Sequence, residues 1–550
     1  MPERPAVTRA LIPPNSRRAE FAKLFLPPGS RRRIAAKNMF DAATGRVGLL
    51  EALADTPTSE DGRLRRFIAR NRPQLAAAGV KRGVHVVDTS DARFDPADLP
   101  ADDLVVFAAP GDVHEPELVP LLAATDPSLD LVSWDDVTIG DDGGPTEPRV
   151  RPRWSPDTHR VAPYLHRCFA VRAGAIATSQ WHPVGAGPTL AGGSPVASAA
   201  VTITDVDLWR LVEAVDPDPG RTLRLPWFLS RTRRRTDRLP ADAVAESLAR
   251  RGIDARPGSE GLRLDFADTA PRPTVTIVVP TRHHRENMGQ LLPALANTAH
   301  DGVELVVVDN GGRSGDNEAW YASQPFADRT TVHWWTRPFN WSAVNNFGAS
   351  LGSGEILVFC NDDALPVRGD WLADLCGWLT VPGVGAAGPL IVDSRDRVGE
   401  AGIAAGLADL CEHFLRGADP RGVEMVGPVG WPRDVLAVTG ACVAVTAATF
   451  DAVGGFDEEY ELTGSDVAFG VAVVEAGLRN VCTGLASVRH DERTTRSGPD
   501  HPHDVDRLTA RLAPYLDDDP VFSAQLSRWH ACPRLATAAE QRDRRIPGAP

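Results

Sequence analysis

The stretch GEILVFCNDDA, residues 354–364, is the part of the sequence that says most about the fold. An unbroken apolar run follows a Gly-Ser-Gly turn and ends in Asn361, Asp362 and Asp363. A buried parallel strand has this pattern when its carboxyl end opens onto a ligand crevice. Two adjacent carboxylates repel each other unless a cation or a proton lies between them. We therefore expect a charged ligand site at the end of this strand.

Strands and helices alternate on the amino-terminal side of this stretch. The patterns predict strands at 275–279, 303–308 and 332–335, and helices at 285–298 and 341–351. Such alternation is typical of a parallel sheet wound through right-handed crossovers. The first two strands are closed by residues 280–282 and 309–312. These polar and glycine residues should line one edge of the sheet, where a nucleotide would lie.

The amino-terminal half has a weaker version of the same alternation. It predicts helices at 39–53, 62–78 and 242–251, a helix beginning at Asp205, and strands at 84–87, 104–107 and 129–134. The last of these strands is expected to end at Asp135 and Asp136. The proline-rich residues 267–273 predict a domain boundary near residue 270.

Two short matches indicate an internal repeat. Residues 104–107 (LVVF) match 356–359 (ILVF), and 205–208 (DVDL) match 466–469 (DVAF) in the same order and at similar separations. The first copy has Ala-Pro-Gly-Asp at 109–112, where the second has the acidic pair. Nothing before Val84 resembles the strands at 275 and 303, so the first copy is expected to lack the nucleotide edge.

Composition excludes several classes of protein. The 550 residues carry a net charge of −14, which disfavours nucleic-acid binding because phosphate neutralisation needs a basic face. Seven scattered cysteines without a CxxC pair suggest neither a disulfide framework nor a zinc site, so a reducing cytoplasm is expected. No apolar run is long enough to span a bilayer, and residues 1–18 lack the apolar core of a signal peptide.

Three side chains are candidates for chemistry. Asp363, with Asp362, can supply ligands for a divalent cation on a nucleoside diphosphate, although Asn and Asp are also favoured turn residues. Asp466 opens a helix, where a carboxylate should stay ionised and serve as a general base; its alternative role is helix capping. His490 could be a neutral imidazole metal ligand, or merely structural.

Aromatic residues and glycines add weaker signals. Tryptophans could stack on sugar faces, although core packing is the commoner fate: Trp334, Trp335, Trp341, Trp371 and Trp431. The turn GGFD at 454–457 stands ahead of the Asp466 helix and is a candidate support for an acceptor loop.

The order of these motifs resembles the family 2 glycosyltransferases of GT-A fold. The resemblance covers roughly residues 273–500 and rests on 280–282 (PTR), 307–310 (VVDN), 339–346 (FNWSAVNN), 354–363, 439–442 (TGAC), 454–457, 465–467 (SDV) and 489–492 (RHDE). The first half is similar to the amino-terminal region of bacterial two-module members, through 133–136 (SWDD), 154–157 (WSPD) and 204–208 (TDVDL). Rhamnosyltransferase-like enzymes of surface-polysaccharide assembly are among these relatives.

The resemblance implies inverting transfer of a sugar from a nucleotide-diphospho-sugar, with Mn²⁺ or Mg²⁺ as cofactor. Asp466 would be the base, and Asp363 and His490 would hold the metal. The implied nucleotide-sugar-binding residues are Pro280, Thr281, Arg282, Asp309, Asn310, Asn340, Asn345 and Asp362. The sequence departs from the family pattern at Ser465, Ala468 and Arg489, which alters the surroundings of the base and of the histidine.

The expected fold is α/β, with a catalytic GT-A (Rossmann-like) module in the carboxyl-terminal half. The expected divisions are a helical region at 1–80, a degenerate, non-catalytic GT-A-like module at 81–270, the catalytic module at 271–500, and a helix and tail at 501–550. The acceptor would be a glycan or a lipid-linked hydroxyl at the inner face of the plasma membrane, in cell-surface polysaccharide synthesis. Two alternatives stay open: a glycan-binding scaffold built on GT-A modules, and a sugar nucleotidyltransferase, which would need a glycine-rich loop that residues 280–284 do not offer.

Overall fold

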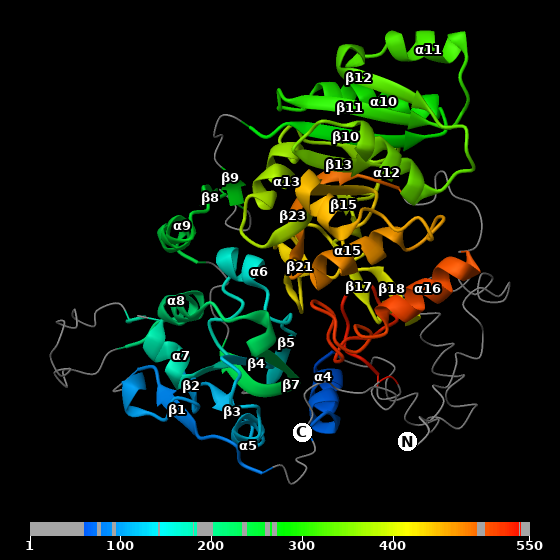
Figure 1. Cartoon of the computed structure of the whole chain (residues 1–550). Coiled ribbons are helices and arrows are strands. Elements are labelled where there is room, and N and C mark those ends of the chain that lie inside the picture. The colour runs from blue at the N-terminus through cyan, green and yellow to red at the C-terminus, as the bar shows by residue number, and fades with distance from the viewer. Residues whose placement is uncertain are drawn as a thin grey trace, which may run out of the picture.

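The computed structural model describes residues 60–73, 79–90, 95–140, 144–179, 181–183, 202–233, 239–258, 264–266, 272–491, 501–537 and 540. The described chain contains two large sheets, one built from residues 84–233 and the other from residues 275–489 (Figure 1). We call these parts the first unit and the second unit. The predicted helix at 39–53 lies outside the described residues, and the one predicted at 62–78 appears as α4 (Glu60–Arg70).

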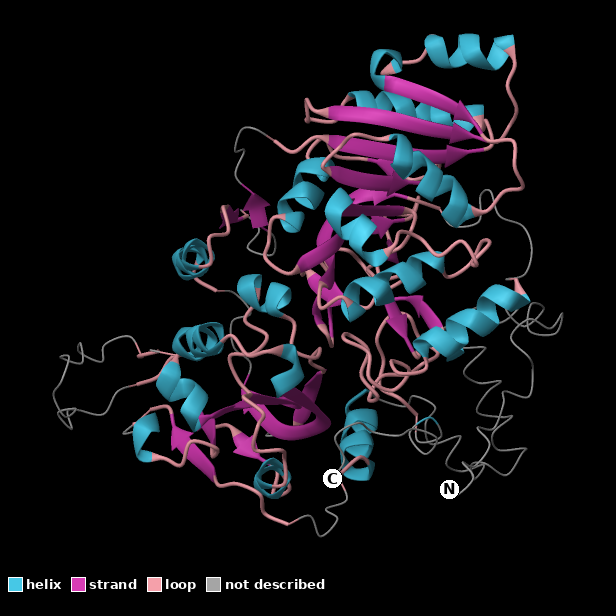
Figure 2. Ribbon diagram, viewed as in Figure 1, coloured by secondary structure: helices cyan, strands magenta, loops and turns pink. Residues whose placement is uncertain are grey.

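The second unit is built on a mixed sheet with helices packed against its faces (Figure 2). Its strand order is β12-β11-β10-β13-β22-β15-β23-β14. The bounds are β10 (Val275–Thr281), β11 (Val303–Asp309), β12 (Thr330–Trp334), β13 (Ile356–Cys360), β14 (Leu365–Pro366), β15 (Val384–Val392), β22 (Cys442–Thr446) and β23 (Arg479–Arg489). The parallel sheet predicted from the alternation is correct for β10 to β13. It is wrong for β22, which runs antiparallel to both β13 and β15.

The helices of the second unit start and stop where local chemistry favours it. They are α10 (Arg285–Ala296), α11 (Gly315–Ala322), α12 (Trp341–Leu351), α13 (Trp371–Leu379), α14 (Ala447–Val453) and α15 (Ser465–Glu475). Asn340 caps α12 by accepting the Ala343 N–H, and Gly352 follows its last turn. Gly454 and Gly455 both have positive φ, at 84° and 71°, which confirms the glycine turn ahead of α15.

The first unit repeats the strand order of the second. Its sheet runs β1-β2-β6-β4-β7-β3, with β5 on β4. The bounds are β1 (Val84–Asp88), β2 (Leu104–Ala108), β3 (Val113–His114), β4 (Leu131–Ile139), β5 (Pro145–Arg149), β6 (Phe169–Arg172) and β7 (Thr222–Arg233). Six strands of the first sheet have counterparts in the second, with the same neighbours and the same parallel or antiparallel pairing. In the order β1, β2, β6, β4, β7 and β3, these counterparts are β10, β13, β22, β15, β23 and β14.

The match extends to single residues. Val84 faces Leu104 as Val275 faces Ile356, so the two apolar tetrapeptides of the sequence repeat lie on equivalent strands. Each unit has a pair of long parallel strands with a register shift, β4 and β7 in the first unit and β15 and β23 in the second. After the shift, Asp136 pairs with Ser230 in the first unit, and Ile391 pairs with Val488 in the second. The helix α8 (Asp205–Val215) also follows β6 as α15 follows β22. Within the described residues β1 takes the place of β10, and three strands of the second sheet, β11, β12 and β21 (Arg433–Val435), have no counterpart in the first.

One predicted strand end is wrong. The strand β4 does not stop before Asp135 and Asp136 but continues to Ile139, so both carboxylates lie fully buried inside the sheet. Arg151 compensates the pair: its backbone N–H donates to Asp135 at 2.8 Å and its guanidinium pairs with Asp136 at 2.5 Å. A buried ion pair of this kind is invisible in the hydrophobic pattern, which treats acids as strand terminators.

The two units share apolar cores. One cluster joins Val105 and Leu131 of the first unit to Val275 and Leu292 of the second. Another joins Phe228 to Val278 and to Phe522, which lies after α16 (Pro502–Leu512). This carboxyl-terminal segment is drawn in red in Figure 1, close to α4 and between the two sheets. The units therefore pack as one body despite the proline-rich connection near residue 270.

The helices of the described chain do not include one with the length and apolar character that a bilayer crossing needs.

Candidate active site

The ends of β10, β11 and β13 meet at one edge of the second sheet. Thr281 lies opposite Asp309 in the parallel register, and its hydroxyl donates to Asp362 at 2.6 Å. Asn287, on α10, donates to the other oxygen of Asp362 at 3.3 Å. Burial raises the pKa of Asp362, while these two donors oppose the rise. Asp362 therefore ties the acidic loop to β10 and α10, which leaves Asp363 as the acid that faces away from these donors.

Asp363 lies against the predicted histidine. One Asp363 oxygen is 3.1 Å from His490 Nε2, and His490 Nδ1 is 3.4 Å from Glu400. Burial alone would lower the pKa of His490, but its contacts to the two carboxylates raise this pKa to about 10. The two acids that face the ring thus favour its protonated form, and a cation bound in this place would compete with that proton.

The spacing of this pair fits a divalent cation. Two ligands at right angles on an octahedral ion, each about 2.1 Å from it, stand roughly 3 Å apart. The described residues hold no group of three or more His, Cys, Asp or Glu side chains arranged for a metal. Mg²⁺-type sites on nucleotides commonly use one or two protein ligands and complete their shell with phosphate and water, so the pair suffices.

Asp466 lies at the start of α15. It accepts hydrogen bonds from the backbone N–H groups of Gly440, at 2.9 Å, and Val467, at 2.8 Å. Burial raises the pKa of Asp466, opposed by the Gly440 N–H and by the neighbouring His413. Removal from water therefore raises this pKa although the carboxylate lies at a helix amino terminus. A raised pKa brings the carboxylate closer to the range in which a general base works well.

Trp341 connects the acidic loop to the base. Its indole Nε1 is 3.3 Å from the side-chain oxygen of Asn361. A Cβ added at Gly440 would lie 2.8 Å from the same indole and 3.2 Å from Asp466 Cβ. Position 440 therefore accepts only glycine, because the tryptophan and the base close over it. The half-buried Trp341 thus lies beside Asn361 of the acidic loop and beside Gly440, whose N–H donates to the base.

Asp309 lies below the surface of the edge. It is fully buried and accepts hydrogen bonds from His283 at 2.7 Å, Tyr321 at 2.8 Å and the Gly311 N–H at 2.6 Å. The His283 ring packs against Trp320, Tyr321 and Trp334, with centroids 5.3 to 6.4 Å apart. The carboxylate thus orients an imidazole within an aromatic cluster at the end of β11 and β12.

The other predicted residues divide into two groups. Pro280 and Asn310 continue the edge of β10 and β11, and Arg282 is exposed beside them. Asn340 caps α12 and donates to the Glu458 carbonyl. Asn345 is fully buried and donates to the Trp341 carbonyl. The last two asparagines therefore support α12 and its neighbours rather than face the edge. Trp335, Trp371 and Trp431 are buried in the core.

Glu400 and His413 are site residues that sequence reasoning missed. Glu400, on β16 (Val398–Glu400), stands between His490 and His413, which is 3.5 Å from its other oxygen. His413 lies on β18 (Cys411–His413). Neither residue belongs to a local motif; only the fold brings them together.

The fold and the site define a class: α/β proteins in which acidic and imidazole side chains gather at the carboxyl edge of a mixed sheet. Residues 276–407 match the family model described as glycosyl transferase family 2. The second unit therefore carries a glycosyltransferase domain of this family, and its sheet is that of the GT-A fold.

The chain is similar to larger proteins. It is 28% identical over 447 residues to the O-antigen biosynthesis protein RfbC of Myxococcus xanthus, covering 77% of this chain and 34% of the relative. It is 32% identical over 267 residues to the uncharacterized protein y4gI of Sinorhizobium fredii, covering 46% of this chain and 29% of the relative. The chain thus spans about a third of the length of these relatives. Among solved structures, GalNAc-T7 with UDP, GalNAc and Mn²⁺ matches with a TM-score of 0.36 at 14% identity, over 44% of this chain and 48% of the other.

Proposed function

We propose that the second unit transfers a sugar from a nucleotide-diphospho-sugar to an acceptor hydroxyl, with inversion and with a divalent cation. The observation that carries this proposal is the Asp363–His490 pair at 3.1 Å on the edge that Trp341 links to Asp466. The family match and the name of the Myxococcus relative support the chemistry and its use in surface-polysaccharide assembly.

Asp363 and His490 would hold Mn²⁺ or Mg²⁺. The bound cation would neutralise charge on the leaving diphosphate. Asp362, held by Thr281 and Asn287, keeps the acidic loop in place. The nucleoside end of the donor is assigned to the side of β10 to β12, where Asp309 orients His283 beside Trp320 and Trp334.

Asp466 is assigned the removal of the acceptor proton. The Gly440 N–H donates to one oxygen of the Asp466 carboxylate, and this hydrogen bond fixes the orientation of the carboxylate. A single in-line displacement at the sugar carbon, with the proton passing to Asp466, inverts the configuration and needs no covalent intermediate. The acceptor is proposed to be a glycan or a lipid-linked hydroxyl at the inner face of the plasma membrane, and the enzyme to act in the cytoplasm.

We further propose that the first unit, which corresponds to the predicted module at 81–270, is a degenerate copy without catalysis. It supplies Gly111 and Thr232 at the positions of Asp363 and His490, judged from the equivalent registers of β3 and β7. Neither side chain offers the charge or the imidazole nitrogen that a divalent cation needs.

The experiment is a hydrolysis and transfer screen of nucleotide-sugars with Mn²⁺ or Mg²⁺, on the wild type, Asp363→Ala and Asp466→Asn. Asp205→Asn, at the position of Asp466 in the first unit, is the matched control. Turnover of one donor by the wild type and the control, and its loss in the other two, is the expected result. Equal turnover in all four proteins would refute the assignment. Binding of no nucleotide-sugar in a thermal-shift screen would favour the scaffold alternative.

A further inference from the structure

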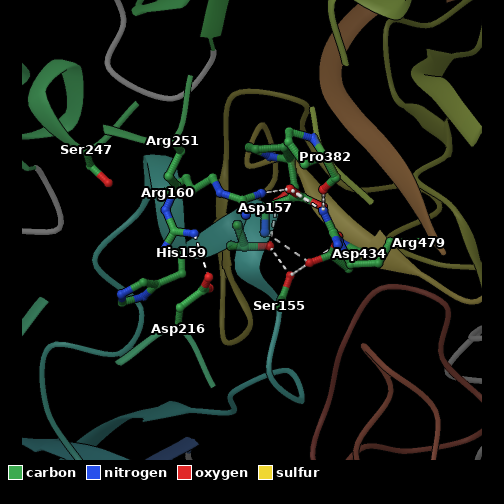
Figure 3. A network of polar contacts seen from close by, with 12 residues as sticks. Ser155, Asp157, His159, Arg160, Asp216, Ser247, Arg251, Pro382, Asp434 and Arg479 are labelled. Carbon is green, nitrogen blue, oxygen red and sulfur yellow. Dashed lines mark hydrogen bonds and ion pairs between the residues drawn. The ribbon is translucent and has the colours of Figure 1, made fainter. Parts of the chain in front are cut away.

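The first unit contacts the second through a compact network of polar side chains (Figure 3). Ser155 and α6 (Pro156–Val161) supply one side, and β21 (Arg433–Val435) and the start of β23 supply the other. Ser155 donates to Asp434 at 2.6 Å, and the Asp157 backbone N–H donates to the same oxygen at 3.2 Å. Thr158 donates to the Pro432 carbonyl at 2.7 Å.

Two carboxylates from different units meet at the centre of this network. Asp157 is fully buried and Asp434 is 7% exposed. Arg479 joins them: its Nε is 2.7 Å from Asp157 and 3.5 Å from Asp434. Arg160 adds a second cation on Asp157. Burial, and then the neighbouring Asp157, raise the pKa of Asp434 well above its usual value.

The strand that carries Asp434 leads directly to the base. All residues from 431 to 445 are buried, and β21 pairs with β23 through Asp434 and Val481. Asn480 donates to the Leu436 carbonyl at 2.8 Å, and Ala437 closes on α15, where a Cβ at Gly470 would lie 2.4 Å from it. Three residues further on, Gly440 donates its N–H to Asp466.

We propose that the first unit is a positioning domain for the general base: by holding Asp434 it fixes the segment 434–440, and with it the amide that orients Asp466. This inference rests on the proposed function of Asp466. It gives the degenerate copy a role that needs no ligand of its own, because a buried, closely packed segment transmits a displacement at one end to the other. Asp157, Asp434 and Ser155 are thus positioning residues, not catalytic ones.

The test uses the full chain with Asp157→Ala, Asp434→Ala and Asp434→Asn. Asparagine keeps a side-chain oxygen that can accept from Ser155 and from the Asp157 N–H, whereas the methyl group of alanine cannot. We expect the two alanine variants to lower kcat by about 10- to 100-fold, the range that a small misplacement of a catalytic group produces, with the KM of the donor unchanged. Asp434→Asn should stay near wild type. Ser155→Ala offers a milder variant should an alanine variant fail to fold.

A second readout is hydrogen exchange of the peptide that contains residues 436–441. Exchange should rise in the alanine variants and in Ser155→Ala, and not in Asp434→Asn. Asp130→Ala is the matched control, since Asp130 is a buried carboxylate that pairs with Arg172 and Arg221 within the first unit. An unchanged kcat in folded alanine variants, or exchange confined to residues 150–161, would overturn the inference. If no protein turns over a nucleotide-sugar, the proposed function fails, while the exchange measurement still decides whether the first unit holds this segment.

Discussion

The edges of the two sheets have the same strand pairing but carry different side chains. In the second unit Asp363 and His490 face each other, backed by Glu400. In the first unit the equivalent residues are Gly111, Thr232 and Arg149, judged from the paired strands. Arg149 donates to Thr232 at 2.8 Å, in the place of the Glu400–His490 contact.

A guanidinium closes the edge of the first unit. Arg167 is 3% exposed, and it pairs with Asp112 at 2.6 Å and with Asp205 at 2.8 Å. Asp205 is the residue in the position of Asp466, and Arg167 precedes Cys168 as Ala441 precedes Cys442 on the equivalent strand. A fixed side-chain cation thus satisfies acids that an open edge would present to a ligand. The comparison teaches that a sheet survives the loss of its site when its remaining charges find partners within the chain.

We expect the largest effect on the rate from a substitution of Asp466, and none from the same substitution of its counterpart Asp205. Asp466→Asn removes the proposed base, and general bases contribute about 10²- to 10⁴-fold to rate. We expect kcat to fall within that range while the KM of the donor stays unchanged, measured by steady-state release of the nucleoside diphosphate. Asp205→Asn should retain the wild-type rate. A comparable fall in rate with Asp205→Asn would mean that the first unit also takes part in catalysis.

A second prediction concerns the Arg167 guanidinium at the edge of the first unit. Arg167→Met keeps the length of the side chain but leaves Asp112 and Asp205 without their guanidinium, and breaking a buried pair in this way typically costs about 3 to 5 kcal/mol. The free energy of unfolding, from urea titration at neutral pH, should fall by an amount of this order. Arg313→Met, which removes an exposed pair with Glu318, is the control and should change it by about 1 kcal/mol or less. Equal small changes in both would show that the edge of the first unit tolerates open acids.

Much of the second unit follows from its sequence, because its strands and helices have local signals. The periodicity of α12 and the β-branched run of β10 give their positions to within two residues. The acidic loop is equally visible, since a strand that ends in Asn-Asp-Asp has few structural reasons to do so. The first unit follows less well: Asp135 and Asp136 look like a strand end, and only the buried Arg151 explains why β4 continues through them.

The parts of the site that sequence reasoning misses are long-range. Glu400 and His413 have no motif of their own and reach the site through β16 and β18. The pKa of Asp466 is long-range as well: the helix start is local, but the burial that raises this pKa and the Gly440 N–H that opposes the rise come from the fold. Local patterns predict elements, whereas the environment of a titratable group depends on the whole fold.

A third prediction uses the pH dependence of the contact between the units. The folded-state pKa of Asp434 is raised, by burial and by Asp157, and opposed by Arg479. Its contribution to stability is therefore complete below the unfolded pKa, about 3.9, and is lost as the pH rises through the folded value. Asp434→Asn cannot lose this proton. The melting temperature of the wild type should thus decline relative to the variant as the pH is raised from 5 to 9, and parallel curves would contradict a raised pKa of Asp434.

The smallest prediction concerns how the two equivalent helices begin. In the first unit Thr204 caps α8 in a capping box with Asp207, with hydrogen bonds in both directions. In the second unit α15 begins after Gly464, which has no side chain to cap it, and the first-turn carboxylate of Asp466 is turned toward Gly440 instead. Thr204→Ala should lower the free energy of unfolding by about 1 kcal/mol, the usual value of an N-cap, measured by urea titration. Gly464 has a φ of 89°, so Gly464→Thr would strain the backbone rather than restore a cap, and should destabilise the protein as well. A gain in stability from Gly464→Thr would contradict this expectation and show that α15 merely lacks a cap.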